Sequence, residues 1–251
     1  MHRFLCPNQD FQKPRISLTN PKEIHHLKNV LRLKPQDKIL IFNGQGEEGE
    51  GHIESLTPSE VIISLQPQTI KREAESQIKI ALACAIPKKA KFEYIIEKCT
   101  ELGVDEIIPM KTARTEIHAT EEIAQRKFHR YQTVGINAAK QSQRKILPVI
   151  FPITTFKDAL KTLLTPATKA FIPALFGKRE LLKSALSNSS SPYKRILFFI
   201  GPEGDFTPQE VDLAIEAGCT PLSLGPTTLK VDTAAITVVA FCRQFLLHNE
   251  E

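Results

Sequence analysis

The sequence predicts an α/β fold in which a small β-rich N-terminal domain precedes a larger domain with a parallel sheet. The apolar run at residues 196–200 has the length and composition of a strand that is buried on both faces. A glycine loop, a helix start and a second apolar run at residues 221–224 follow it, which is the order of elements in an α/β unit. Near the N-terminus, residues 38–42 and 61–65 are β-branched runs separated by turn residues, as expected of paired strands.

The helix between the two apolar runs has clear start and stop signals. Thr207 is placed to cap it, Pro208 occupies the first helical position, and Glu210 can close a capping box. Gly218 is expected to end it, because glycine adopts the left-handed conformation of a helix C-terminus most readily. A long apolar helix is predicted from about Asp232 onward.

Two loops that contain glycine and proline follow the apolar runs, and they are the candidate ligand site. They begin at Gly201-Pro202 and Gly225-Pro226, and in open parallel sheets ligands bind beyond the carboxyl ends of the strands. Neither loop matches the GxGxxG or the P-loop motif. Ordinary βα turns are the alternative, but a pair of such loops with Glu203 and Lys230 beside them favours a site.

Composition describes a soluble globular protein. The 251 residues carry a net charge of +5, with 41% hydrophobic and 24% charged residues. The longest apolar runs, such as residues 80–86, are shorter than a membrane span requires, and the N-terminus does not resemble a signal peptide. The five cysteines form no CxxC pair, which predicts buried free thiols in a reducing cytoplasm.

Positive charge is concentrated in the middle of the chain. Residues 126–145 hold six basic side chains and no acidic one, whereas residues 1–70 are balanced and the chain from residue 196 onward is acidic. Such a patch favours a polyanionic partner, although a solvated helix face explains it nearly as well.

The N-terminal domain is expected to contain one helix and a few strands. Asn20 and Pro21 cap a helix whose apolar residues recur at helical spacing, residues 46–51 are expected to form a turn, and residues 51–56 a third strand. The polar stretch at residues 66–77 is the expected linker. His25 and His26 have no further ligand nearby, so a metal site is not predicted.

The second domain is expected to open with a buried strand at residues 78–86. An amphipathic helix follows, which Gly103 ends, and a short strand begins near Ile107. A further helix is predicted at residues 128–142 and a strand at residues 170–176.

Several motifs together resemble the RsmE family of the SPOUT-class methyltransferases, which methylate N3 of a uridine in 16S ribosomal RNA. They are HHLKNVLR at residues 25–32, KKAKFEYIIEKCTELGV at 88–104, NAAKQSQR at 137–144, IGPEGDFT at 200–207 and LKVDTA at 229–234. The resemblance implies a PUA-like RNA-binding β-barrel at residues 1–70 and a SPOUT domain with a trefoil knot at residues 74–251.

The resemblance also implies S-adenosylmethionine as cofactor, the 16S rRNA of the small ribosomal subunit as substrate, and a homodimer. The implied cofactor contacts are Leu175, Phe176, Gly201, Pro202, Glu203, Gly204, Leu224, Gly225 and Leu229. The implied RNA contacts are Arg3, His25, His26, Arg32, Lys88, Lys89, Gln141, Ser142 and Arg144.

Catalysis requires stabilisation of the uracil anion that forms when N3 loses its proton. Lys230 or Arg144 is the expected cationic group, and Glu203 is expected to position the loop or to accept the proton. A purely loop-tethering role is the alternative for Glu203.

The chain departs from the family pattern at several positions. Gln36, Gln143 and Asp205 stand where the family usually has glycine. Asn137 and Lys140 replace acids, which predicts a more basic surface, and Lys230 replaces arginine with the same charge. The departures at positions 137, 140, 205 and 230 keep one alternative open, a catalytically silent RNA-binding or assembly protein. A second alternative is a knotted methyltransferase that acts on ribose 2′-OH or on tRNA, against which the motifs at residues 25–32 and 137–144 argue.

Overall fold

The protein folds into two compact units. The computed structural model describes residues 1–7, 9–74, 76–88, 91–115, 120–187 and 193–250. Unit 1 comprises Met1–Glu75 together with Ala139–Leu147, and unit 2 comprises Ser76–Ala138 and Pro148–Glu251. The division near residue 75 falls within the expected linker, but the assignment of 139–147 to unit 1 has no counterpart in the contiguous domains expected from the sequence.

Unit 1 is a six-stranded sheet with a short helical segment and a 3-10 turn. Its strands follow the order β1-β3-β4-β5-β2, with β6 paired to β4, and all pairs are antiparallel except β1 with β3. The elements are β1 (Arg3–Leu5), β2 (Arg15–Leu18), α1 (Pro21–His25), the π-helical turn η1 (His26–Val30), β3 (Lys38–Phe42), β4 (Glu47–Leu56), β5 (Val61–Leu65), the 3-10 turn η2 (Pro67–Thr69) and β6 (Lys71–Arg72).

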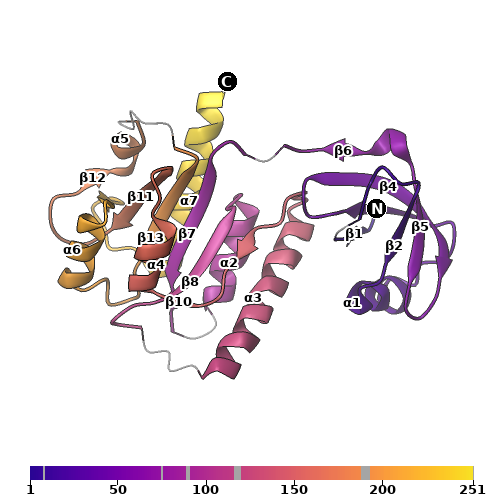
Figure 1. Cartoon of the computed structure of the whole chain (residues 1–251), viewed down its shortest axis with the longest axis horizontal. Helices are drawn as coiled ribbons and strands as arrows, with labels where there is room; N and C mark the ends of the chain where they lie inside the picture. Colours follow the sequence, from indigo (N-terminus) through magenta and orange to yellow (C-terminus); the bar gives the residue numbers. More distant parts are fainter. Residues whose placement is uncertain (8, 75, 89–90, 116–119, 188–192, 251) are drawn as a thin grey trace. The chain divides into compact units, whose positions relative to one another are not determined.

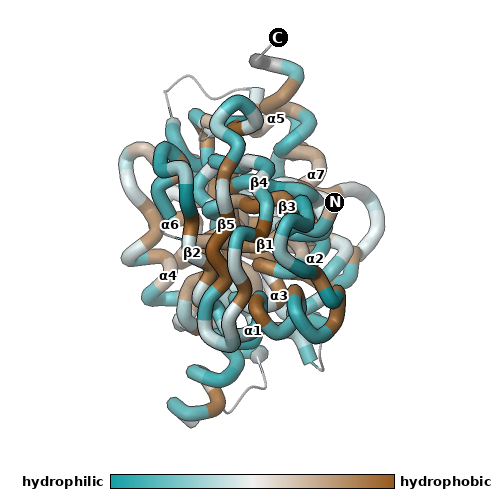
Figure 2. Tube along the Cα trace, turned by 90° about the vertical axis from the view of Figure 1, so that its right-hand side faces the viewer, coloured by the Kyte–Doolittle hydropathy of each residue, from teal (hydrophilic) through white to brown (hydrophobic). Residues whose placement is uncertain are grey.

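The sequence predicted part of unit 1. Strands β3 and β5 have the predicted bounds, and Asn20 caps α1 by accepting from the backbone N–H groups of Lys22 and Glu23. In Figure 2 much of β5 is brown, in agreement with its buried Val61, Ile63 and Leu65. The short strands β1 and β2 carry no periodic signal and were missed.

The prediction of a turn at residues 46–51 was wrong, because residues 47–51 form the first half of β4. Gly51 resembled a turn residue but is needed for close strand packing. A Cβ built there would lie 2.8 Å from the carbonyl oxygen of Ser64 on β5, closer than real Cβ atoms come.

Unit 2 is an eight-stranded sheet in which every pair is parallel. The order is β10-β8-β7-β13-β11-β14-β12, with β9 also paired to β8. The strands are β7 (Lys79–Ala85), β8 (Glu106–Lys111), β9 (Val149–Ile150), β10 (Thr154–Thr155), β11 (Thr168–Pro173), β12 (Glu180–Leu181), β13 (Arg195–Ile200) and β14 (Thr220–Ser223).

Helices cover both faces of this sheet (Figure 1). They are α2 (Lys91–Glu101), α3 (Glu121–Gln141), α4 (Phe156–Leu163), α5 (Leu182–Ser187), α6 (Pro208–Glu216) and α7 (Val231–Glu250). Alternate residues of β13 enter opposite cores: Phe198 packs with residues of α2, α5 and α7, while Phe199 packs with residues of α4 and α6. The prediction that this strand is buried on both faces is confirmed.

The helix signals around α6 are confirmed as well. Thr207 and Glu210 form the capping box, with Pro208 at the first position. Gly218 has φ +98° just beyond the last turn. The strand expected at residues 170–176 is shorter, since β11 ends at Pro173 and the next residues turn away as a loop.

Helix α7 is the one described helix with a stretch, Val231–His248, that is long and apolar enough by length and composition to cross a membrane. The prediction that no stretch reaches that length does not hold for α7. Its Ala235, Val238, Val239 and Cys242 are buried in the core of unit 2, which is the packing of a core helix in a globular domain.

Candidate functional site

A pocket lies at the carboxyl ends of three adjacent parallel strands, β11, β13 and β14. The loops that leave these strands line it, and it encloses about 620 Å³ of space that is partly open to solvent. That volume and position are typical of a site for a small organic cofactor.

Seven of the expected cofactor contacts line this pocket. They are Leu175, Gly201, Pro202, Glu203, Leu224, Gly225 and Leu229. The two others, Phe176 and Gly204, belong to the same loops but do not line it. The two glycine loops expected to form one site therefore do meet.

The glycines give a ligand access to the backbone. Gly225 has φ +126°, a conformation that side-chain-bearing residues rarely adopt, and a Cβ there would point into open space. At Gly201 a Cβ would lie 3.0 Å from the ring of Phe206, a contact tighter than nine in ten real Cβ contacts, so a side chain here would have to displace the ring or the loop slightly. Exposed backbone groups over an apolar floor suit the adenosine part of S-adenosylmethionine.

Three consecutive residues of the loop after β13 each contact a different neighbouring loop. The carboxylate of Glu203 accepts from the backbone N–H of Lys88 at 3.1 Å, after β7. The carbonyl of Gly204 accepts from the guanidinium of Arg114, after β8. The carboxylate of Asp205 accepts from the N–H of Leu175 at 3.1 Å, after β11. We call residues 201–206 the central loop, because it joins all three.

The buried carboxylate of Glu210 fixes the base of the central loop. It accepts from the N–H of Thr207 at 2.9 Å, which completes the capping box, and from the N–H of Ala113 at 2.8 Å. One side chain thus satisfies two backbone donors on two loops, which explains why a carboxylate is buried here.

Several pocket residues were missed from the sequence. Asp205 was noted only as a departure from the family pattern, and Arg179 lies between β11 and β12 without any motif. The guanidinium of Arg179 donates to the carbonyl of Ala174 at 2.9 Å. The remaining ones are Pro173, Ala174, Ile200, Leu222, Thr227, Thr228, Val231 and Ala234. Their place in the predicted elements could have identified them, because they lie at or beyond the carboxyl ends of the parallel strands or at the start of α7.

The expected catalytic residues fall in different units. Glu203 lines the pocket, and Lys230 is an exposed residue directly before α7, next to the pocket residues Leu229 and Val231. Arg144 belongs to unit 1. A common catalytic role of these three residues stays a prediction.

Burial controls the chemistry of the thiol at the end of β7. The pKa of Cys84 lies well above its ordinary value, first because of burial, then because of Cys99, and finally because of the carboxylates Glu203 and Asp232. Its thiol is therefore neutral and a poor nucleophile. Among the described residues no group of three or more His, Cys, Asp or Glu side chains is arranged to hold a metal ion.

The expected RNA contacts are spread over both units. Lys88 lies in unit 2, and Lys89 lies outside the described residues. His25 and Arg32 are exposed in unit 1, while the ring of His26 packs 6.0 Å from that of Phe4. Gln141, Ser142 and Arg144 sit at and beyond the end of α3, in the segment that belongs to unit 1.

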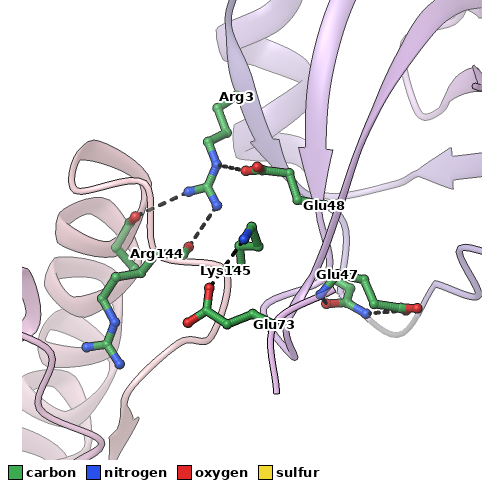
Figure 3. A network of polar contacts seen from close by, with 8 residues as sticks. Arg3, Glu47, Glu48, Glu73, Arg144 and Lys145 are labelled. Carbon is green, nitrogen blue, oxygen red and sulfur yellow. Dashed lines mark hydrogen bonds and ion pairs between the residues drawn. The ribbon is translucent and has the colours of Figure 1, made fainter. Parts of the chain in front are cut away.

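Arg3, one of the expected RNA contacts, makes several contacts inside unit 1. Its guanidinium pairs with Glu48 at 2.7 Å and donates to the backbone carbonyls of Ala139 and Arg144, and its side chain is only 8% exposed (Figure 3). It also lies 3.7 Å from the centre of the Phe42 ring. These contacts occupy the guanidinium inside unit 1, and the expected RNA contact of Arg3 stays a prediction.

Lys140, which replaces an acid of the family pattern, pairs with an acid of the same unit. Its ammonium group lies 2.9 Å from both carboxylate oxygens of Glu23, and the two side chains are 17% and 13% exposed. The pair with Glu23 is neutral, so Lys140 adds no excess positive charge of its own, but an acid at this position would leave two negative charges here. The prediction that the substitution makes this surface more basic than in the family stands.

The comparisons with known proteins agree with this site. A family profile described as an RNA methyltransferase domain matches residues 74–243, and one described as an RNA methyltransferase PUA domain matches residues 18–66. The ribosomal RNA small subunit methyltransferase E of Rickettsia conorii is 32% identical, with 96% of this chain and 94% of the relative covered. The chain belongs to this methyltransferase family.

Two further relatives support the assignment. The methyltransferase E of Synechocystis is 30% identical, with 95% of this chain and 76% of the relative covered. A crystal structure of the Neisseria gonorrhoeae methyltransferase E bound to S-adenosylmethionine has a TM-score of 0.84 at 26% identity and covers 98% of each chain. The predicted α/β class, with a PUA-like domain before a SPOUT domain, is thereby confirmed, while the trefoil knot stays a prediction.

Proposed function

We propose that this protein transfers the methyl group of S-adenosylmethionine to N3 of one uridine in the decoding region of the small-subunit rRNA. The observation that carries the proposal is the pocket, where seven expected cofactor contacts converge at the carboxyl ends of β11, β13 and β14. Membership in a family of small-subunit rRNA methyltransferases supports the reaction class.

When bound, S-adenosylmethionine supplies a methyl group that is already activated on a sulfonium. The protein therefore mainly has to position the reactants and to stabilise the deprotonated base. The backbone of the central loop and of residues 224–229 would hold the adenosine, and Arg179 offers a cation for the cofactor's carboxylate.

Lys230 is the proposed group that stabilises the uracil anion. It is exposed beside the pocket, where a base could approach it. Removing one such electrostatic contact typically lowers kcat by about 10²- to 10³-fold. We expect Lys230→Met to have this effect and Lys230→Arg to retain most of the activity, because both cations stabilise the same charge.

Glu203 has two candidate roles, and its hydrogen bond to Lys88 N–H supports the tethering role. Glu203→Gln keeps an oxygen acceptor for that bond but cannot accept a proton. Full activity of Glu203→Gln would assign the tether, and a loss of activity with cofactor binding intact would assign the proton acceptor.

The decisive assay uses labelled S-adenosylmethionine and small ribosomal subunits from a strain that lacks this methylation. We expect a single N3-methyluridine in the decoding region. Lys157→Met is the matched control for Lys230→Met, because Lys157 is an exposed lysine on α4, away from the pocket lining. Label on a ribose or on tRNA would assign another branch of the fold, and absence of label with retained cofactor binding would favour a silent RNA-binding protein.

We further propose that the enzyme is a cytoplasmic homodimer. Helix α7 buries one face in unit 2 but leaves Phe241 and Leu247 exposed at 38% and 49%, and a second copy would cover such residues. Sedimentation or light scattering on the full chain measures the oligomeric state directly.

A further inference from the structure

Asp205 combines a strained backbone, an anchoring hydrogen bond and a place in the pocket wall. Its φ is +59°, and its N–H closes a turn onto the carbonyl of Pro202 at 2.9 Å. Its carboxylate accepts from the N–H of Leu175, which also lines the pocket. A glycine would adopt this backbone more easily, so the side chain has to be explained by what it contributes.

The pocket lining contains three charged side chains, which are Arg179, Glu203 and Asp205. Two carboxylates and one guanidinium give the described lining one excess negative charge. The cations Arg114 and Lys230 lie next to the central loop and to the start of α7 but are not part of the lining. Loss of the Asp205 charge makes the electrostatic potential inside the pocket more positive, because one full negative charge is removed. This change has the same sign whatever the neighbouring cations contribute.

The cofactor and its product differ in charge at the reacting centre. S-adenosylmethionine carries an ammonium, a carboxylate and a sulfonium, so its net charge is +1. Loss of the methyl group turns the sulfonium into a neutral thioether, and S-adenosylhomocysteine has no net charge. A negative charge in the pocket wall therefore attracts the substrate form more strongly than the product form.

We propose that Asp205 is a specificity-determining residue that makes the pocket prefer the sulfonium cofactor to the thioether product. This inference rests on the proposed function, because it presumes that the pocket binds S-adenosylmethionine. The hydrogen bond to Leu175 keeps the carboxylate against the pocket wall, so that its charge acts on the ligand instead of pointing into solvent. The consequence is weaker product inhibition than a neutral residue at position 205 would give.

The test is calorimetric titration of the full chain with S-adenosylmethionine, S-adenosylhomocysteine and sinefungin, an analogue with a charged amine in place of the methylated sulfur. Asp205→Asn removes the charge but keeps an oxygen acceptor for Leu175 and tolerates a left-handed backbone. One partly screened charge across a pocket changes affinity by roughly 3- to 10-fold. We expect Asp205→Asn to weaken both charged ligands by this factor and S-adenosylhomocysteine by less than about 2-fold.

Asp212→Asn is the matched control, since it makes the same charge change on the exposed face of α6, outside the pocket lining. It is expected to leave all three affinities unchanged. Wild-type titrations at two salt concentrations give an independent test, in which added salt should weaken the charged ligands more than the neutral one.

Equal weakening of all three ligands in Asp205→Asn would overturn the inference and leave Asp205 as a loop anchor alone. Equal salt dependence of all three ligands in the wild type would overturn it even if the variant did not fold. If the wild-type protein bound none of the ligands, the proposed function would fail together with the inference, so the two failures are distinguishable.

Discussion

Arg3 shows that a side chain's type does not determine its contacts. A basic residue near the start of an RNA-modifying chain suggests a phosphate contact, yet Arg3 is almost fully buried and pairs with Glu48. Its further partners, the carbonyls of Ala139 and Arg144, lie more than 130 residues away in sequence. No local pattern could have indicated them.

Replacing Arg3 by alanine should destabilise unit 1 strongly. The substitution leaves the carboxylate of Glu48 buried without its cation, and breaking such a pair typically costs about 3 kcal/mol or more. Chemical denaturation followed by circular dichroism measures the loss.

The control for this substitution is Arg15→Ala. Arg15 also pairs with a glutamate, Glu54, but the two side chains are 69% and 37% exposed. We expect a change of no more than about 1 kcal/mol there, because solvent screens the pair. Similar losses in both variants would show that burial of the Arg3 pair is not what matters.

The positions where the chain departs from the family's glycines keep a glycine-like backbone. Gln36, Gln143 and Asp205 have φ of 76°, 60° and 59°. The loops thus keep the conformation that the resemblance implies, and the strain is borne by side-chain-bearing residues.

At the level of elements, glycine at the end of α3 should stabilise the protein. Gln143 lies two residues beyond α3 in the left-handed region, where a side chain costs roughly 1 kcal/mol relative to glycine. We expect Gln143→Gly to raise the free energy of unfolding by about 0.5–1 kcal/mol. The larger conformational entropy of glycine in the unfolded chain offsets part of this gain.

Gly218→Ala is the reverse substitution at the end of α6. Gly218 has φ +98°, and no atom lies within 4 Å of the position that a Cβ would take, so the substitution tests the backbone cost alone. It should lower stability by about 1 kcal/mol. A neutral result at both positions in thermal denaturation would show that neither terminus is strained.

Much of unit 2 could be predicted at the element scale, because its strands and helices have strong local signals. A few neighbouring residues are enough to predict each of three elements: the apolar run predicts β13, the capping box predicts the start of α6, and the apolar stripe predicts α2. The loops of the pocket could be located for the same reason, since they follow those strands. What the sequence could not show is which loop reaches which, as with Asp205 and Leu175, because these contacts join residues far apart in the chain.

At the scale of the whole molecule, the five thiols link stability to alkaline pH. Burial raises the pKa of Cys6, Cys99, Cys219 and Cys242 from 9.0 to about 12, with smaller effects of nearby charges on Cys6 and Cys242. Above pH 9 a thiol in the unfolded chain loses its proton while the folded one keeps it. The free energy of unfolding therefore decreases as the pH rises from 9 toward 12. Each thiol contributes up to about 1.4 kcal/mol per pH unit to this decrease.

This linkage predicts two measurements. The free energy of unfolding should fall between pH 8 and pH 10, and a thiol reagent at pH 8 should modify all five cysteines only after unfolding, since each is buried in the native fold. A serine variant of Cys219, which lies near the end of α6, should make the decrease of the free energy of unfolding with pH less steep, by the contribution of one thiol. Rapid modification of the native protein would contradict the buried state.

The segment at residues 139–147 has a consequence for how the protein is made. Leu147 and Gly46 donate from their N–H groups to the carbonyls of Gly44 and Lys145, and Arg3 requires two carbonyls of the same segment. A fragment cut after residue 75 would lack these partners, so the N-terminal part of the chain is not a self-sufficient domain. During synthesis the N-terminal sheet would stay incomplete until residues 139–147 had emerged from the ribosome. The final maturation of the part that comes first in the sequence thus depends on a piece of chain that is translated much later.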